Sequence, residues 1–184
     1  MTDAEQDALR EGLKTVAVAL KESGVPFALM GGYAGWVHGA PEPGHDVDFL
    51  VPESDAPRAA EELDRRDLSV RQPPEDWLFK VEVDGVTVDV IHRTSGASIS
   101  EVLADASVVE VLSVEMPVVS ATDVTTEKLL AMDEHFCDLG AVLPTLRALR
   151  EQVDWDKVRR RVAGEPFAET VLFLLERLEV ISPA

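Results

Sequence analysis

Two aspartates separated by one residue follow a pair of glycines, and no other part of the sequence limits the fold so strongly. Gly31 and Gly32 are followed by thirteen residues and then by Asp46-Val47-Asp48. Residues two apart in a strand point to the same face, so both carboxylates would project together from a strand. A Gly-Gly turn that leads into a helix offers backbone N–H groups to a polyphosphate. The pattern predicts an acidic site beside a phosphate-binding turn.

A third aspartate lies in a second strand-like run. The segment 86–91 reads Val-Thr-Val-Asp-Val-Ile, and Asp89 falls on the opposite face from its valines. Three carboxylates in one cleft are hard to leave unpaired, whereas Mg²⁺ prefers such oxygen ligands. Glu82 and Asp84 are alternatives for the third acid, although Asp84-Gly85 fits a hairpin turn. The three aspartates are therefore expected to bind metal: Asp46, Asp48 and Asp89.

These glycines and acids resemble the motif of the DNA polymerase β-like nucleotidyltransferase superfamily. The sequence of residues 27–34, together with His38-Gly39 before the acids, is similar to that of the small prokaryotic branches of this superfamily. Those branches include aminoglycoside nucleotidyltransferases and the toxin-like nucleotidyltransferases of abortive-infection and toxin–antitoxin systems. The resemblance covers residues 24–92 and implies transfer of a nucleoside monophosphate from an NTP, with ATP as one donor, to an acceptor, with release of pyrophosphate.

The resemblance also implies roles for individual residues. Asp46 and Asp48 would bridge two Mg²⁺ ions, for which Mn²⁺ is a substitute, and Asp89 would complete the site and accept the proton of the acceptor. The nucleotide is expected to contact four residues: Gly31, Gly32, Tyr33 and Lys128. Many relatives carry the pattern Arg-x-Thr-x-Asp, in which the aspartate is the first acid. In this chain Glu42 stands in place of the arginine and Gly44 in place of the threonine.

That departure favours two alternatives. The chain could be a non-catalytic interaction protein of a toxin–antitoxin-like module, or a metal-dependent phosphohydrolase that uses the same acids. Simpler interpretations of single residues also stay open: the glycines as a tight turn, Lys128 as a local partner of Glu127 or Asp123, and Lys80 either at the site or in solvent. His45 and His92 are expected to be polar loop residues rather than ligands, and the role of His135 stays open. The candidates for stacking on a base are Tyr33, Trp36 and Trp77.

Composition limits the partners. The net charge of −18 argues against nucleic acid, whose binding rests on Lys and Arg, and against anionic membranes. It fits a cationic small molecule or a basic protein as acceptor, although six basic residues gather between Arg147 and Arg161. The single cysteine, Cys137, excludes an internal disulfide, and neither a membrane span nor a signal peptide is recognisable. A cytoplasmic protein is expected.

The pattern of apolar residues predicts an α/β (α+β) fold: a small mixed sheet flanked by helices, then a helical C-terminal region. We expect a catalytic domain over 1–121 and helices over 122–184. Helices are expected at 3–22, 33–38, 55–67, 128–133 and 139–150, with Pro144 starting or kinking the last. Strands are expected at 27–30, 46–51, 78–83, 86–91, 108–112 and 118–119, with Pro117 interrupting the last pair.

Three smaller expectations concern the end of the chain. One apolar stripe is formed by Trp155, Val158 and Val162, and a second by Phe167, Val171, Leu174 and Leu178. The segment 134–138 either lines the substrate side of the cleft or forms a helix junction. The junction is favoured, with Phe136 and Cys137 in the core.

Overall fold

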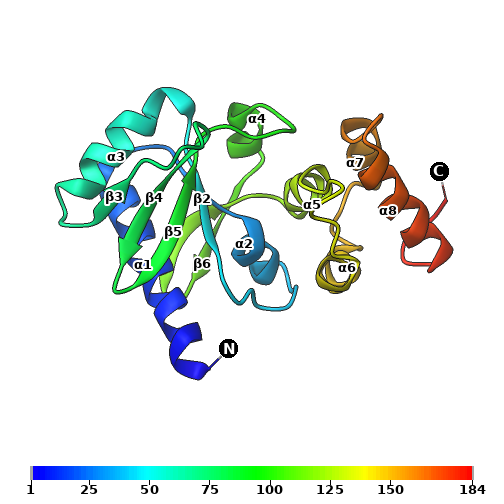
Figure 1. The fold of residues 1–184 in the computed structure, drawn as a ribbon, viewed down its shortest axis with the longest axis horizontal. Coiled ribbons are helices and arrows are strands. Elements are labelled where there is room, and N and C mark those ends of the chain that lie inside the picture. The colour runs from blue at the N-terminus through cyan, green and yellow to red at the C-terminus, as the bar shows by residue number, and fades with distance from the viewer. Residues whose placement is uncertain (1, 184) are drawn as a thin grey trace.

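A computed structural model describes residues 2–183 of the chain. One mixed sheet of seven strands, in the order β3-β4-β5-β2-β1-β7-β6, organises the N-terminal two thirds (Figure 1). The central strands β1 and β2 are antiparallel, and β5 is parallel to β2. The strands are β1 (Ala28–Met30), β2 (Val47–Leu50), β3 (Ser69–Arg71), β4 (Leu78–Val83), β5 (Val86–Ile91), β6 (Ser107–Val111) and β7 (Val114–Val118). The predicted α/β fold class is confirmed.

Helices cover the sheet and continue beyond it. In Figure 1, α1 and α3 lie on one side of the strands, and α5 to α8 extend away on the side of α2. The helices are α1 (Asp3–Ser23), α2 (Gly31–Val37), α3 (Ala56–Asp64), α4 (Ile99–Ala104), α5 (Ala121–Leu130), α6 (Leu139–Leu149), α7 (Trp155–Arg161) and α8 (Pro166–Arg177). A 3-10 turn at Glu53–Asp55 precedes α3. Within residues 2–183, no helix has the length and apolarity needed to cross a bilayer.

Local sequence signals explain where several elements begin and end. Thr2 and Glu5 form a capping box at the start of α1, and Gly24 ends that helix in the left-handed conformation. Asp84 and Gly85 have positive φ and form the tight turn between β4 and β5, as the sequence predicts. Both strands of this hairpin have the bounds expected from the sequence.

Other elements differ from the sequence prediction. Helix α5 begins at Ala121 rather than at residue 128, because Ser120 caps it and the threonine-rich first turns are buried against other helices. Pro117 does not interrupt β7, since the ladder still pairs it with Val108. Strand β3 and helix α4 were not expected, although Ser98 and Glu101 form a capping box before α4. Pro144 lies inside α6.

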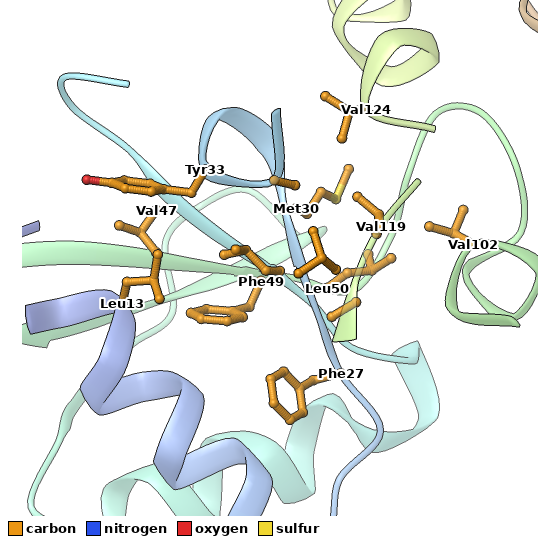
Figure 2. Packing of buried hydrophobic residues seen from close by; sticks show 14 of the residues in the cluster. Leu13, Phe27, Met30, Tyr33, Val47, Phe49, Leu50, Val102, Val119 and Val124 are labelled. Atoms are coloured by element: carbon orange, nitrogen blue, oxygen red, sulfur yellow. The ribbon is translucent and has the colours of Figure 1, made fainter. Parts of the chain in front are cut away.

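The core joins the two predicted regions. Side chains of α1, β1, β2 and α5 pack in a single hydrophobic cluster, which Figure 2 shows around Phe49 and Leu50. Helix α5 also contacts α6, α7 and α8, so it lies between the sheet region and the last helices. The division of the chain after residue 121 stays a prediction.

Two expectations about the C-terminal region are wrong. Phe136 is 75% exposed and Cys137 is exposed, so the segment between α5 and α6 does not enter the core. In α8 the buried face consists of Ala168, Val171, Leu172 and Leu175, while Leu178 is exposed. The actual stripe uses the i, i+3, i+4, i+7 spacing that starts at Ala168.

Candidate active site

The strand register places two of the three predicted acids side by side. Asp48 in β2 is paired with Asp89 in the neighbouring parallel strand β5, and Lys80 in β4 continues the same row. On the other side, Met30 at the end of β1 is paired with Asp48. Residues paired in this way point to the same face of a sheet. Asp46 lies just before β2, two residues from Asp48, and is exposed.

The turn after β1 meets the Asp48 side chain closely. Gly31 has a φ of +65°, and a Cβ atom at this position would lie 1.8 Å from the Asp48 Oδ2 atom. The missing side chain thus leaves room for the carboxylate, and the φ value suits glycine. A Cβ at Gly32 would lie 2.8 Å from Cβ of Pro43. The structure brings together both glycines and Asp48, as the sequence predicts.

Asp48 is the most perturbed carboxyl group of this site. Burial raises the pKa of Asp48 to about 6, and the charges of Asp46 and Asp89 add to the shift. Lys128 and Lys80 act in the opposite direction. The ionised form of Asp48 is therefore costly unless positive charge approaches it. Such charge could come from a cation or from the two lysines.

The other two acids already have basic neighbours. The Asp46 Oδ2 atom lies 2.6 Å from Nδ1 of His45. Lys80 Nζ donates to both carboxylate oxygens of Asp89, at 2.9 and 3.0 Å. Of the two open interpretations of Lys80, the structure supports a place at the site. His45 is an exposed loop residue, as expected, but it touches a predicted metal ligand.

A metal ion needs several oxygen donors close together. Three carboxylates are the donor set that Mg²⁺ prefers, and the mutual repulsion felt by Asp48 is what a divalent cation would relieve. As they stand, however, no three His, Cys, Asp or Glu side chains in residues 2–183 are grouped closely enough to hold a metal. The donors fit in type and in strand position. Binding would require Asp46 and Asp89 to leave His45 and Lys80.

A cleft of about 380 Å³ lies over the glycines and the first two acids. Lys128 of α5 lines it, and the charge of this lysine acts on the Asp48 carboxyl group. Helix α6 supplies the opposite wall. Six further residues line the cleft that the sequence does not predict to do so: Pro41, Pro43, Gly140, Ala141, Pro144 and Thr145. Nothing in their spacing indicates that α6 folds back over residues 41–46.

Not every predicted site residue faces this cleft. The side chain of Tyr33 is fully buried, and its hydroxyl accepts a hydrogen bond from Gln6. Figure 2 shows Tyr33 among the packed residues of the hydrophobic cluster. Only the backbone of Tyr33 is near the glycines, so a direct contact of its ring with a nucleotide is not supported. His92 and His135 lie outside the cleft lining. Among the basic C-terminal residues, Lys157, Arg159 and Arg161 are paired with carboxylates.

Glu42 has a structural role in place of the expected basic residue. Its two carboxylate oxygens accept hydrogen bonds from Arg10 Nε and Nη2, at 2.8 and 2.7 Å. Gln6 Nε2 also donates to the backbone oxygen of Pro43. These contacts fasten the loop before Asp46 to α1, and they hold the pKa of Glu42 below its ordinary value.

The loop attachment leads to a prediction with a defined pH dependence. A carboxyl group with a lowered folded-state pKa stabilises the protein above its unfolded pKa, and that contribution is lost as the pH falls through the folded pKa. We therefore expect Glu42→Gln to lower the melting temperature at pH 7, and this effect to shrink as the pH falls below about 4 through the lowered folded-state pKa. Thermal unfolding at several pH values measures this. Asp7→Asn, which removes the exposed partner of Arg10, is the control and should cost less. If Glu42→Gln lowered the melting temperature as much at the lowest pH as at pH 7, the role of the ion pair would be contradicted.

Solved nucleotidyltransferase structures are similar to this fold. A crystal structure of ANT(2'')-Ia with adenylyl-2''-tobramycin aligns with a TM-score of 0.65 at 13% identity, over 88% of this chain and 98% of that chain. An antigenic nucleotidyltransferase-like protein from Paracoccidioides brasiliensis aligns with a TM-score of 0.64 at 14% identity, over 95% and 89%. Lincomycin-bound LnuA, a lincosamide antibiotic adenylyltransferase, aligns with a TM-score of 0.54 at 11% identity, over 78% and 97%.

At such low identities the likeness establishes the fold. The chain has the nucleotidyltransferase fold, and the fold expected from the glycine and aspartate motif is confirmed. No protein-family model and no curated protein sequence matches the chain.

Proposed function

We propose that this protein transfers a nucleoside monophosphate from a magnesium-bound NTP to an acceptor, with release of pyrophosphate. The observation that carries the proposal is the pairing of Asp48 with Asp89 directly against the Gly31 turn. Carboxylates beside a glycine turn and a lysine can hold both a divalent cation and a polyphosphate. The adenylyl group on tobramycin in the ANT(2'')-Ia complex supports ATP as the donor.

Each residue has a role that follows from its position. The triphosphate would lie in the cleft lined by Gly31 and Gly32, and Lys128 would neutralise part of its charge. Asp89 would orient the acceptor hydroxyl and accept its proton, once Lys80 has released the carboxylate. Catalysis would rest on positioning and charge neutralisation, and the chain needs no covalent nucleophile.

Asp46, Asp48 and Asp89 are the residues that would hold two Mg²⁺ or Mn²⁺ ions. When bound, these ions supply charge stabilisation for the attacking and leaving oxygens of the displacement. The metal would also remove the repulsion that raises the pKa of Asp48.

A thermal-shift measurement tests this proposal. A ligand that binds only the folded state stabilises it by about 2.7 kcal/mol at a hundredfold excess over its Kd, so millimolar Mg²⁺ with α,β-methylene-ATP should raise the melting temperature by several degrees. Mg²⁺ alone should have a smaller effect, because the triphosphate supplies part of the coordination shell. The triple variant Asp46→Asn, Asp48→Asn, Asp89→Asn is the matched control and should show no shift. A shift of equal size in that variant would place the nucleotide elsewhere.

A second candidate is a non-catalytic interaction protein with this fold. The pairing of Asp89 with Lys80, and the contact of Asp46 with His45, favour it because two of the three acids are engaged without a metal. In that case Mg²⁺ with the nucleotide would leave the melting temperature of the wild type unchanged. Calorimetry with Mg²⁺ and ATP would give the same answer by an independent measurement.

A further inference from the structure

A second cavity lies on the face of the sheet that carries the acids. It has a volume of about 450 Å³, and its lining includes Met30, Ile91, Trp77 and Glu127. Met30 is paired with Asp48, and Ile91 lies two residues beyond Asp89 in β5. Residues two apart in a strand share a face, so Ile91 points to the same side as Asp89. The second cavity therefore lies next to the row that Met30, Asp48 and Asp89 form across the sheet.

The two spaces differ in chemistry. The cleft over the glycines contains Asp46, Asp48 and Lys128, which suit a triphosphate that is bound together with a divalent cation. The second cavity is lined mainly by apolar atoms of Met30, Ile91, Trp77 and Ala131, with few polar groups. Apolar walls with a few fixed polar groups are typical of sites for small organic molecules, and the volume falls in their usual range.

Two charged residues line the second cavity, and one of them is already neutralised by ion pairs within the protein. Arg93, which lines it, forms ion pairs with Glu53 and Asp76 at 2.8 and 3.1 Å. Glu127 is the other charged lining residue; burial raises the pKa of its carboxyl group, and the backbone N–H groups of Ser95 and Gly96 partly offset that shift. Within residues 2–183 no salt bridge to a Lys, Arg or His side chain is found for the Glu127 carboxylate, which lines the cavity. A single positive charge bound beside it would favour its ionised form.

The wall of the cavity is held in place before any ligand arrives. The loop after β5 is fastened by the Arg93 ion pairs, by the bond from Thr94 Oγ1 to the Ala97 oxygen, and by Glu127. A Cβ atom at Gly96 would lie 2.4 Å from the Glu127 carboxylate, so the loop and α5 approach closely. Such preorganisation lowers the cost of binding.

We infer that this second cavity is the acceptor site, and that it takes a hydroxyl-bearing molecule with an apolar or aromatic body and a single cationic group. The inference rests on the proposed function, because it gives the cavity its role from its position beside Asp89. The apolar body would pack on Trp77 and Ile91, and the cation would face Glu127. A polycation would find one carboxylate and an apolar wall, so it would gain little here.

Two small probes test the inference. Tyramine has an aromatic body, a hydroxyl and one ammonium group, whereas ethanolamine has the same two polar groups without the aromatic body. The chain has three tryptophans, so the Trp77 indole signal can be assigned in a nitrogen-15 NMR spectrum through Trp77→Phe. Tyramine should shift this signal in a saturable manner, and ethanolamine at equal concentration should not. Equal shifts with both probes, or none with tyramine, would overturn the inference.

A pair of variants tests the location. Ala131→Phe fills the cavity from an exposed position at the end of α5, and Ala104→Phe places the same side chain at the exposed end of α4, outside the cavity. We expect Ala131→Phe to weaken tyramine binding at least fivefold and Ala104→Phe to leave it unchanged. An unchanged affinity in Ala131→Phe would place the probe elsewhere and overturn the inference.

A competition experiment separates the acceptor from the base of the nucleotide. Tyramine should still bind when the protein is saturated with Mg²⁺ and α,β-methylene-ATP, because the two ligands would occupy different spaces. Competition between them would assign the cavity to the nucleobase and overturn the acceptor assignment. Tyramine binding with no binding of the Mg²⁺-nucleotide would instead contradict the proposed transfer and leave only the small-molecule site supported.

Discussion

Replacing Asp48 by asparagine is expected to abolish nucleotide transfer while making the metal-free protein more stable. The carboxylate is half-buried near two other acids, and burial and their charges raise its pKa to about 6. An ionised group with a raised pKa destabilises the folded state above that pKa, so the neutral amide should add about 2 kcal/mol to the free energy of unfolding at pH 8. Loss of a central metal ligand should lower the transfer rate by at least about a hundredfold.

The pH dependence gives this prediction a definite sign. The folded state binds a proton at Asp48 more tightly than the unfolded state, so the wild type loses stability as the pH rises from about 4 through 6. Asp48→Asn should lack this loss, and the two unfolding curves should converge near pH 4. Urea unfolding without metal at pH 4, 6 and 8 measures the difference. Asp46→Asn is the control, since Asp46 is exposed and its change should affect stability little. A destabilised Asp48→Asn protein at pH 8 would show that the carboxylate has a stabilising partner.

The second largest effect is expected for Gly31→Ala, because this change both strains the backbone and displaces the Asp48 side chain. Alanine at a φ of +65° costs about 1–2 kcal/mol, and its Cβ would lie 1.8 Å from Asp48 Oδ2. The carboxylate must therefore move to another rotamer, away from the position in which it faces the cleft. We expect the affinity for Mg²⁺ with α,β-methylene-ATP, measured by calorimetry, to fall more than tenfold.

A glycine elsewhere in the chain separates the two contributions. Gly24 has a φ of +67°, and a Cβ there would meet nothing within 4 Å. Gly24→Ala should thus show the backbone strain alone, with unchanged nucleotide affinity. The double variant Gly31→Ala, Asp48→Ala removes the clash, so it should be more stable than the sum of the two single effects on stability predicts. Additive effects would mean that Gly31 and Asp48 do not press on each other.

Part of the candidate site can be predicted from the sequence. Gly31, Asp48 and Asp89 were identified from local features: a glycine pair after a short apolar run, and acids within strand-like alternation. Tyr33 was assigned to the nucleotide because it follows the glycines, but its side chain packs into the core. Sequence position places its backbone at the turn, whereas the direction of its ring depends on α1 and Gln6, which lie far away in the chain.

Errors in the helical region have a similar origin. Phe136 and Cys137 are residue types that are common in protein cores, yet both are exposed. Burial depends on how the helices pack against one another and not on the apolarity of a residue alone. The threonines at the start of α5 have modest helix propensity, and that propensity is overridden by packing between the sheet and the last helices. Such packing cannot be read from a local window.

The sequence alone determined the elements whose signals are local: the hairpin at Asp84-Gly85, the capped first helix, and the turn that requires glycine at position 31. Backbone sterics and capping bonds act over a few residues, so their effects are visible in the order of the residues. Tertiary structure decided the pairing of Lys80 with Asp89, the attachment of Glu42 to Arg10, and the apolar cavity beyond the acids. Each of these joins segments that only the sheet register and the packing of α1 and α5 bring together, because contact between distant segments depends on the whole fold.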